Sequence, residues 1–448
     1  MRLTKIQVSK LFGVFDHTIP LNLADRITII HGPNGFGKTA MLQMVQSLLG
    51  NRFARLRRVP FECFMLDLED GREFSVTKKF PSRTEAERDE SAATLQFQLK
   101  TPGQSPVEFF LPYSPLKEGL RFPLELIDQH IEDLERVGHD TWVHLQTGRK
   151  LQLEDIIELY GEFLPIAPQK KRQIPDWLTK LPNEFDVRLI EAQRLLNITD
   201  NRRSRRAGPY RYEPAVSSYS KELAANVQEV QAKYGTFSQQ LDSSFPMRVF
   251  QAQSAASIDT TELTRRLQEL EQRRQRIIAA GLLAPEEQSA PIFGPQKTED
   301  ETKKSILSLF AEDIEKKLEV FHEITAKVEL FKELVNKRFA YKKLDIERQA
   351  GFRFQTSAGL PLLPTDLSSG EQHELVLLYE LLFKTKQNAL ILIDEPELSL
   401  HVAWQVEFLK DLARVVKLSS FDVILATHSP QIIHDRWDLA IGLKGPEV

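Results

Sequence analysis

Gly32-Pro33-Asn34-Gly35-Phe36-Gly37-Lys38-Thr39 is the stretch that decides the fold prediction for this chain of 448 residues. It fits the Walker A pattern G-x-x-x-x-G-K-[ST], in which backbone N–H groups surround phosphates, the lysine reaches the β- and γ-phosphate oxygens, and the hydroxyl binds Mg²⁺. A strand-like apolar run, residues 26–31, precedes the loop, and a helix-like run, residues 40–49, follows it. The predicted ATP-binding residues are Asn34, Gly35, Phe36, Gly37, Lys38 and Thr39, and Thr39 is also a predicted Mg²⁺ ligand.

A pair of acidic residues follows a second apolar run near the end of the chain. Residues 389–393 are continuously apolar, which is typical of a buried parallel strand, and Asp394 and Glu395 come next, at the end where α/β sheets bind ligands. Two buried carboxylates without compensation would cost on the order of several kcal/mol, whereas a metal ion and a polarised water compensate them. We predict that Asp394 binds the metal, directly or through water, and that Glu395 is the general base. The alternative is an acidic pair that only caps a loop.

Two further segments contain residue types that can contact phosphate. Residues 421–427 form another apolar run, which ends at His428, although a single histidine in such a place is more often structural than functional. Residues 367–372 read L-S-S-G-E-Q and precede a helix-like run at 375–383. A helix start with small residues binds phosphate through its free N–H groups and its dipole. An ordinary helix N-cap by Ser368 or Ser369 is the alternative.

The order of these four segments resembles the nucleotide-binding domain of ABC-type ATPases. This resemblance implies that His428 contacts the γ-phosphate as a catalytic residue. It also implies that Ser368, Ser369 and Gly370 contact the γ-phosphate held by another protomer, so that a homodimer builds each ATP site in trans. Ser369 stands where that family has a glycine.

Two shorter runs refine the resemblance. Residues 395–401, E-P-E-L-S-L-H, resemble the corresponding run of OLD-like and SMC-like ATPases, which implies an interprotomer loop at 399–401. Residues 192–195, A-Q-R-L, resemble the strand end that supplies a glutamine to Mg²⁺ and to the attacking water in that group. Gln193 is therefore predicted as both a catalytic residue and a metal ligand, with a buried structural glutamine as the alternative.

The chain as a whole resembles the ATPase subunits of bacterial anti-phage systems, most of all PARIS and next Septu. The resemblance implies a sensor and scaffold that forms a higher homo-oligomer and holds a separate effector, a Toprim-type nuclease, because no nuclease domain is expected in this chain. A phage protein or DNA would be the trigger, and the arginine cluster at 202–206 is a candidate contact for it. The alternatives are an SMC-like ATPase of DNA repair or chromosomes and, third, a transporter's ATP-binding subunit.

The predicted fold class is α/β: an ABC-type P-loop head with a mixed or parallel sheet, an antiparallel β subdomain and a helical insertion. The predicted domains are residues 1–120, residues 121–340 with a strand near 187–195 that returns to the head, and residues 341–448. Helices are expected within the insertion at 124–136, 154–163, 219–234, 260–280 and 301–339. The last domain, from residue 344 onward, is expected to alternate strands and helices as in a parallel sheet.

Composition favours a cytoplasmic protein without a membrane partner. The net charge is −4, 41% of the residues are hydrophobic, and no run of about eighteen apolar residues occurs. The single cysteine, Cys63, cannot form an internal disulfide.

Overall fold

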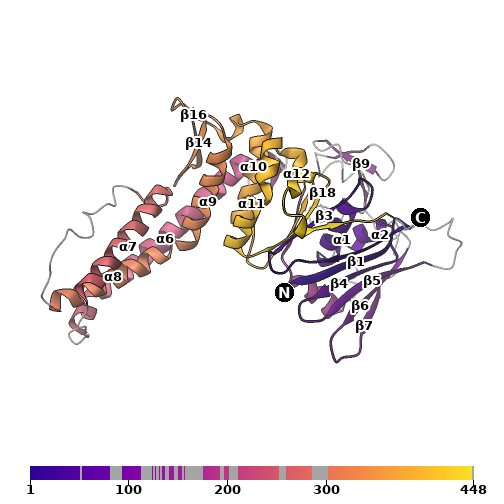
Figure 1. Cartoon of the computed structure of the whole chain (residues 1–448), viewed down its shortest axis with the longest axis horizontal. Helices are drawn as coiled ribbons and strands as arrows, with labels where there is room; N and C mark the ends of the chain where they lie inside the picture. Colours follow the sequence, from indigo (N-terminus) through magenta and orange to yellow (C-terminus); the bar gives the residue numbers. More distant parts are fainter. Residues whose placement is uncertain are drawn as a thin grey trace. The chain divides into compact units, whose positions relative to one another are not determined.

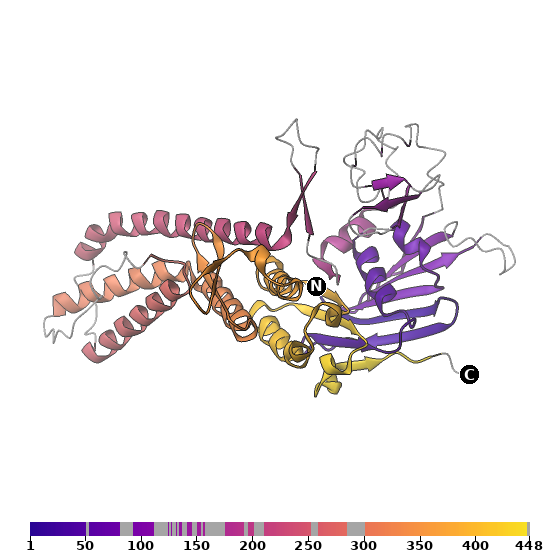
Figure 2. The ribbon, with the colours of Figure 1, turned by 90° about the horizontal axis from the view of Figure 1, so that it is seen from above.

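The computed structural model describes residues 1–50, 53–80, 93–111, 124, 127, 131, 134–136, 141–145, 150–153, 156, 175–191, 196–200, 210–251, 259–284 and 301–445. The chain divides into two compact units (Figures 1 and 2). The first unit comprises Met1–Arg194, Ile198–Tyr212 and Thr385–Val448, and the second comprises Leu195–Asn197 and Glu213–Lys384. Within the described ranges, no helix is both long enough and apolar enough to cross a bilayer.

The first unit contains a five-stranded parallel sheet in the order β11-β17-β18-β3-β19. Its strands are β11 (Val187–Ile190), β17 (Leu390–Asp394), β18 (Asp422–Thr427), β3 (Ile27–His31) and β19 (Ala440–Gly442). The central strands are apolar and buried because helices and the second sheet cover them. Since all five strands run the same way, their carboxyl ends meet at one edge. The strand predicted near 187–195 does return to this sheet.

A six-stranded antiparallel sheet, in the order β2-β1-β4-β5-β6-β7, forms the second layer of the first unit. Its strands are β1 (Leu3–Leu11), β2 (Phe15–Pro20), β4 (Cys63–Leu68), β5 (Glu73–Lys79), β6 (Thr94–Lys100) and β7 (Val107–Leu111). Buried and partly buried residues alternate along β4 and β6, as expected of a sheet with one face in the core. The predicted antiparallel subdomain is therefore confirmed.

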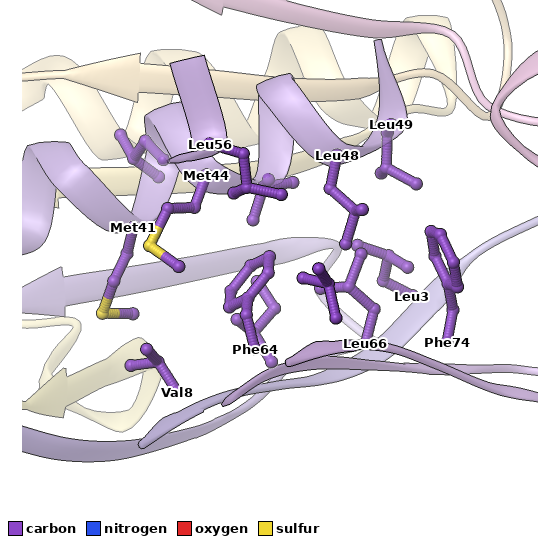
Figure 3. Packing of buried hydrophobic residues seen from close by; sticks show 14 of the residues in the cluster. Leu3, Val8, Met41, Met44, Leu48, Leu49, Leu56, Phe64, Leu66 and Phe74 are labelled. Carbon is purple, nitrogen blue, oxygen red and sulfur yellow. The ribbon is translucent and has the colours of Figure 1, made fainter. Parts of the chain in front are cut away.

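Helix α1 (Lys38–Leu49) packs against both sheets and carries the main core of the first unit. Its side chains Met41, Met44, Leu48 and Leu49, with Leu56 of α2 (Phe53–Arg58), face strand residues of the antiparallel sheet (Figure 3). The strand residues labelled there are Leu3, Val8, Phe64, Leu66 and Phe74. On its other side, α1 contacts β11, β17 and β18. The helix that begins at the phosphate-binding loop is thus fixed in position by both layers.

The first unit contains further helices and strands. They are α5 (Asp176–Asn183), α11 (Val402–Ser419), α12 (Pro430–Ile433), the 3₁₀ helices η8 (Pro396–Ser399) and η9 (Trp437–Leu439), and the strands β8 (Leu134–Arg136), β9 (Thr141–His144) and β10 (Lys150–Gln152). Strands β12 (Leu196–Asp200) and β13 (Tyr210–Pro214) pair with each other. The helix expected over 124–136 is wrong at its end, because residues 134–136 pair with β9 over the buried ring of Trp142.

The second unit is mainly helical, as predicted for the insertion. Its long helices are α6 (Ala215–Gln251), α7 (Thr260–Ala279), α8 (Glu301–Glu319) and α9 (His322–Arg338), so the single helix expected over 301–339 is divided in two. Helices α6, α7 and α8 lie side by side (Figures 1 and 2). Leu263, Leu267 and Leu270 make the buried stripe of α7, while its arginines pair with acids, for example Arg266 with Glu315 of α8.

A separate sheet in the second unit contradicts one expectation. Residues 344–354 do not join the parallel sheet, because β14 (Lys342–Glu347) pairs antiparallel with β15 (Gly351–Thr356), which in turn pairs antiparallel with β16 (Pro361–Leu362). The later strands β17 and β18 do join the parallel sheet as expected. The turn ends at Gly351, whose φ of 77° suits glycine, and whose missing Cβ lets the backbone of Ser220 approach. The short η6 (Pro364–Asp366) then leads to helix α10 (Ser369–Tyr379), which ends in a π-helical turn, Glu380–Lys384.

Candidate nucleotide-binding site

The loop between β3 and α1 has the backbone of a phosphate cradle. Gly35 and Gly37 have φ values of 86° and 89°, a left-handed conformation that favours glycine. At Gly37 a Cβ would also collide with the side chain of Leu11. Helix α1 begins directly afterwards at Lys38, and the first N–H groups of a helix have no partner within it. These donors are suited to bind an anion at the loop.

Lys38 lies at the base of this loop and is only 5% exposed. Its Nζ donates hydrogen bonds to the carbonyl oxygens of Gly32 (2.7 Å) and Pro33 (3.1 Å). The carbonyl oxygen of Phe36 lies 3.0 Å from Nε2 of His17, on the neighbouring strand β2. The ends of the loop are therefore fixed, and the ammonium group is held where phosphate oxygens could replace the carbonyl oxygens as acceptors.

A hydrogen bond joins the loop to the acidic strand end. The Thr39 hydroxyl donates to Oδ1 of Asp394 at 3.0 Å, across 355 residues of sequence. The parallel sheet explains this contact, because β3 and β17 flank β18 and end at the same edge. The structure thus brings together two groups that sequence analysis predicted as ligands of one metal ion.

Burial, together with the charges of Glu395, Glu191 and Glu397, raises the pKa of Asp394 to about 6, although the hydrogen bond from Thr39 opposes this rise. A divalent cation would compensate this charge, and Mg²⁺ prefers such oxygen ligands. Across the described segments, no three His, Cys, Asp or Glu side chains converge to hold a metal unaided. The oxygen atoms of Thr39 and Asp394 fit a Mg²⁺ ion that takes further ligands from nucleotide phosphates and water.

We expect Asp394→Asn to raise the melting temperature of the nucleotide-free protein by a few degrees at pH 7.5 in EDTA. The ordinary Asp pKa is 3.8, whereas in the folded protein it is about 6, so folding stability falls as the pH rises through this window. Asparagine carries no such charge, and the gain should vanish near pH 4. Asp438→Asn, which removes an exposed carboxylate beside Arg436, is the control and should show no gain at pH 7.5. Equal melting temperatures for Asp394→Asn and wild type at pH 7.5 would contradict the expectation.

Glu395 occupies a strained turn at the end of β17. Its φ of 45° is unusual for a residue with a side chain, and its N–H donates to the carbonyl oxygen of Ala426 on β18. Such strain costs about 1–3 kcal/mol and is concentrated at functional sites. His428, which follows β18, is exposed, and its Nδ1 lies 3.8 Å from Oε1 of Glu395. The predicted base and the predicted histidine therefore meet at the same sheet edge as Asp394.

Glu397 is a site residue with no role predicted from the sequence. Its carboxylate is buried, and Oε1 accepts hydrogen bonds from the Thr427 hydroxyl (2.7 Å) and the His428 N–H (2.9 Å). His428 Nδ1 lies 3.1 Å from the same oxygen, nearer than it lies to Glu395. The only signal in the sequence was the E-P-E spacing, which places a second acid two residues after the base.

The predicted signature residues lie in the second unit, at the start of α10. Ser368 caps this helix: its Oγ accepts from the N–H of Glu371 and donates to Oε2 of Glu371, which also accepts from the Ser368 N–H. Burial opposes ionisation of Glu371, but the hydrogen bond from Lys342 and those from Ser368 keep its pKa below the usual range. The local geometry is thus the helix N-cap that was the alternative prediction from the sequence. Ser369 and Gly370 begin the helix, and the first N–H groups of a helix have no partner within it.

Some predictions lie outside the described residues. They include Gln193, the arginine cluster at 202–206 and the helix expected over 154–163, of which only residue 156 is described. Glu191, directly after β11, is described. The loop at 399–401 is described in its backbone: η8 ends at Ser399, and His401 caps α11 through its Nδ1, which accepts from the N–H of Ala403.

The strand, the glycine loop with its lysine and the acid at the end of another strand of the same parallel sheet define a P-loop nucleotide-hydrolysing protein. The chain belongs to the AAA ATPase domain family, whose family model matches residues 1–433. It is thus an ATPase by family, and the family implies nucleotide binding with a divalent metal.

Comparison with solved structures finds SMC head domains. One, from Pyrococcus furiosus, carries an extended coiled coil and is bound to the C-terminal domain of ScpA; it is 14% identical, with a TM-score of 0.34, covering 99% of this chain and 94% of that one. A second, bound to the C-winged helix domain of ScpA, is 12% identical with a TM-score of 0.35 and coverages of 100% and 95%. A third, from Thermotoga maritima, is 11% identical with a TM-score of 0.33 and coverages of 99% and 95%. No curated protein matches the sequence.

Proposed function

We propose that this chain hydrolyses ATP to ADP and phosphate at the edge of the parallel sheet, with Lys38, Thr39, Asp394, Glu395 and His428 as its working residues. The observation that carries the proposal is the hydrogen bond from Thr39 to Asp394, because it joins the phosphate loop to the acidic strand end. Lys38 and the start of α1 bind the phosphates, and Thr39 and Asp394 hold Mg²⁺. The bound ion would neutralise charge on the β- and γ-phosphate oxygens.

The remaining residues act on water and on the γ-phosphoryl group. Glu395 accepts a proton from the attacking water while the water oxygen bonds to the γ-phosphorus. The bond between the γ-phosphorus and the β-phosphate oxygen breaks, which releases ADP. His428 binds the γ-phosphate oxygens. Gln193 would orient the same water and complete the metal ligands.

The active unit in this proposal is a homodimer. Ser368, Ser369 and Gly370 of one protomer contact the γ-phosphate that the other protomer holds, and the helix start at α10 supports this role because it offers N–H groups and a positive dipole end. The proposal predicts complementation between two inactive variants.

Lys38→Ala removes the phosphate contact in cis, and Ser368→Arg blocks the contact in trans. Each variant alone is expected to be inactive, while an equal mixture should recover about a quarter of wild-type turnover, because half of randomly paired dimers are mixed and each contains one intact site. Steady-state phosphate release measures this. A mixture with no more activity than the two separate variants would contradict trans assembly.

We further propose that the ATPase is the sensor and scaffold of an anti-phage system, assembling beyond the dimer, holding a separate Toprim-type nuclease and releasing or activating it on sensing a phage protein or DNA. The supporting observations are the 367–383 and 390–401 stretches of sequence and a helical unit distinct from the unit that carries Lys38. Native mass spectrometry of the chain co-expressed with its genetic neighbours, with and without ATP, tests this. A bound small effector supports it, whereas a bound membrane protein overturns it.

A further inference from the structure

Glu397 is a buried carboxylate beside the proposed ATP site, and it has no role in the proposed hydrolysis. It is 8% exposed, and η8 turns it back toward the end of β18. Its Oε1 accepts from the Thr427 hydroxyl and from the His428 N–H. These two bonds fix the backbone from which the His428 side chain projects.

The same oxygen also faces the imidazole ring. His428 Nδ1 lies 3.1 Å from Oε1 of Glu397 and 3.8 Å from Oε1 of Glu395. An ionised carboxylate only accepts hydrogen bonds, so it favours a proton on Nδ1. With Nδ1 on the side of this carboxylate, Nε2 is the ring atom left to meet a ligand.

A second set of contacts holds the histidine loop to the same segment. The Gln405 side chain donates to the carbonyl oxygens of Glu397 and Leu400, and its Oε1 accepts from the Ser429 hydroxyl at 3.1 Å. The Ser429 N–H donates to the Thr427 hydroxyl oxygen. Residues on both sides of His428 are thus fixed to the turn that follows Glu395, while the His428 side chain itself is 40% exposed.

We propose that Glu397 is a positioning residue: it holds the His428 ring with Nδ1–H toward its own carboxylate and so directs Nε2 to the γ-phosphoryl group. This inference rests on the proposed ATP hydrolysis for its consequence, but the state of the ring can be measured without turnover.

The first test is the protonation of the His428 ring in the wild-type chain at pH 7.5. Long-range ¹H–¹⁵N NMR of ¹⁵N-histidine-labelled protein, assigned with His428→Gln, should show a proton on Nδ1. A ring protonated only on Nε2 would overturn the proposal, whether or not the protein hydrolyses ATP.

The second test separates positioning from a structural role. Glu397→Gln keeps an acceptor oxygen for Thr427 and the His428 N–H but loses the charge, and we expect kcat to fall about 10- to 100-fold, as for loss of other groups that orient a site. ATP affinity should stay within about twofold, since the residue makes no ligand contact. In a His428→Ala background the same substitution should change kcat by less than about twofold, because the two residues act as one.

Asp67→Asn, which removes a half-buried carboxylate paired with Lys5 on the antiparallel sheet, is the matched control and should keep wild-type kcat. An unchanged rate for Glu397→Gln, or an equal loss in both backgrounds, would overturn the positioning role. If wild type itself released no phosphate, the proposed function would fail, and the NMR result would still decide the orientation of His428.

Discussion

Glu395→Gln is expected to leave ATP bound while slowing its hydrolysis by about 10²- to 10⁴-fold, the usual contribution of a general base. Glutamine has nearly the same shape, and the strained turn with its bond from the Glu395 N–H to Ala426 stays intact. It cannot take the proton of the attacking water. Because product no longer forms, the ATP-bound dimer should accumulate. Single-turnover phosphate release, with size analysis in ATP, measures both effects.

Glu73→Gln gives the matched control, because it removes a carboxylate of the same unit that pairs with Lys100 on the exposed part of the antiparallel sheet. That variant should hydrolyse ATP at the wild-type rate. If Glu395→Gln did so as well, Glu395 would not be the base, and another acid at this edge, such as Glu191, would have to be tested.

The parallel sheet could be predicted from sequence because its strands are continuous apolar runs that end at chemical groups. Residues 390–393 and 423–426 are buried throughout, and each leads directly to a site residue. The antiparallel sheet was predictable for a different reason, namely the alternation along β4 and β6, which reflects one buried face.

The errors arose where pairing partners decide the structure. Residues 342–356 have the apolar content of a strand for either kind of sheet, and only the tight turn ending at Gly351 makes them an antiparallel hairpin. Residues 124–136 have apolar residues at helical spacing, but the last three of them, 134–136, form a strand that pairs with β9. The local pattern of apolar and polar residues does not specify which distant strand a segment pairs with.

The residues of the site also divide into those that local sequence predicts and those that depend on how strands pair. Lys38, Thr39, Asp394 and Glu395 belong to motifs whose chemistry is local, so each could be named from the sequence. The contact of Glu397 with Thr427 and His428 depends on β17 and β18 being neighbours and on a left-handed turn at Glu395, neither of which a motif specifies.

Lys38→Ala is expected to weaken ATP binding by about 30- to 5,000-fold, since truncating one partner of a buried charge pair costs about 2–5 kcal/mol. Lys38 donates hydrogen bonds to the carbonyl oxygens of Gly32 and Pro33, so alanine also leaves these acceptors without their donor. Isothermal titration with ATP and Mg²⁺ measures the loss. Lys10→Ala is the control: it removes an exposed lysine of strand β1, which pairs with Asp16, and this variant should bind ATP normally.

The pair of variants separates holding the nucleotide from cleaving it. Lys38→Ala should fail at binding, so no ATP-bound dimer accumulates at any tested concentration below its weakened Kd, whereas Glu395→Gln should bind, dimerise and then stall. Affinity within about threefold of wild type for Lys38→Ala would mean that the loop between β3 and α1 does not hold the phosphates. The Thr39 to Asp394 contact would then be a structural bond between two strands, and the nucleotide site would have to be sought elsewhere.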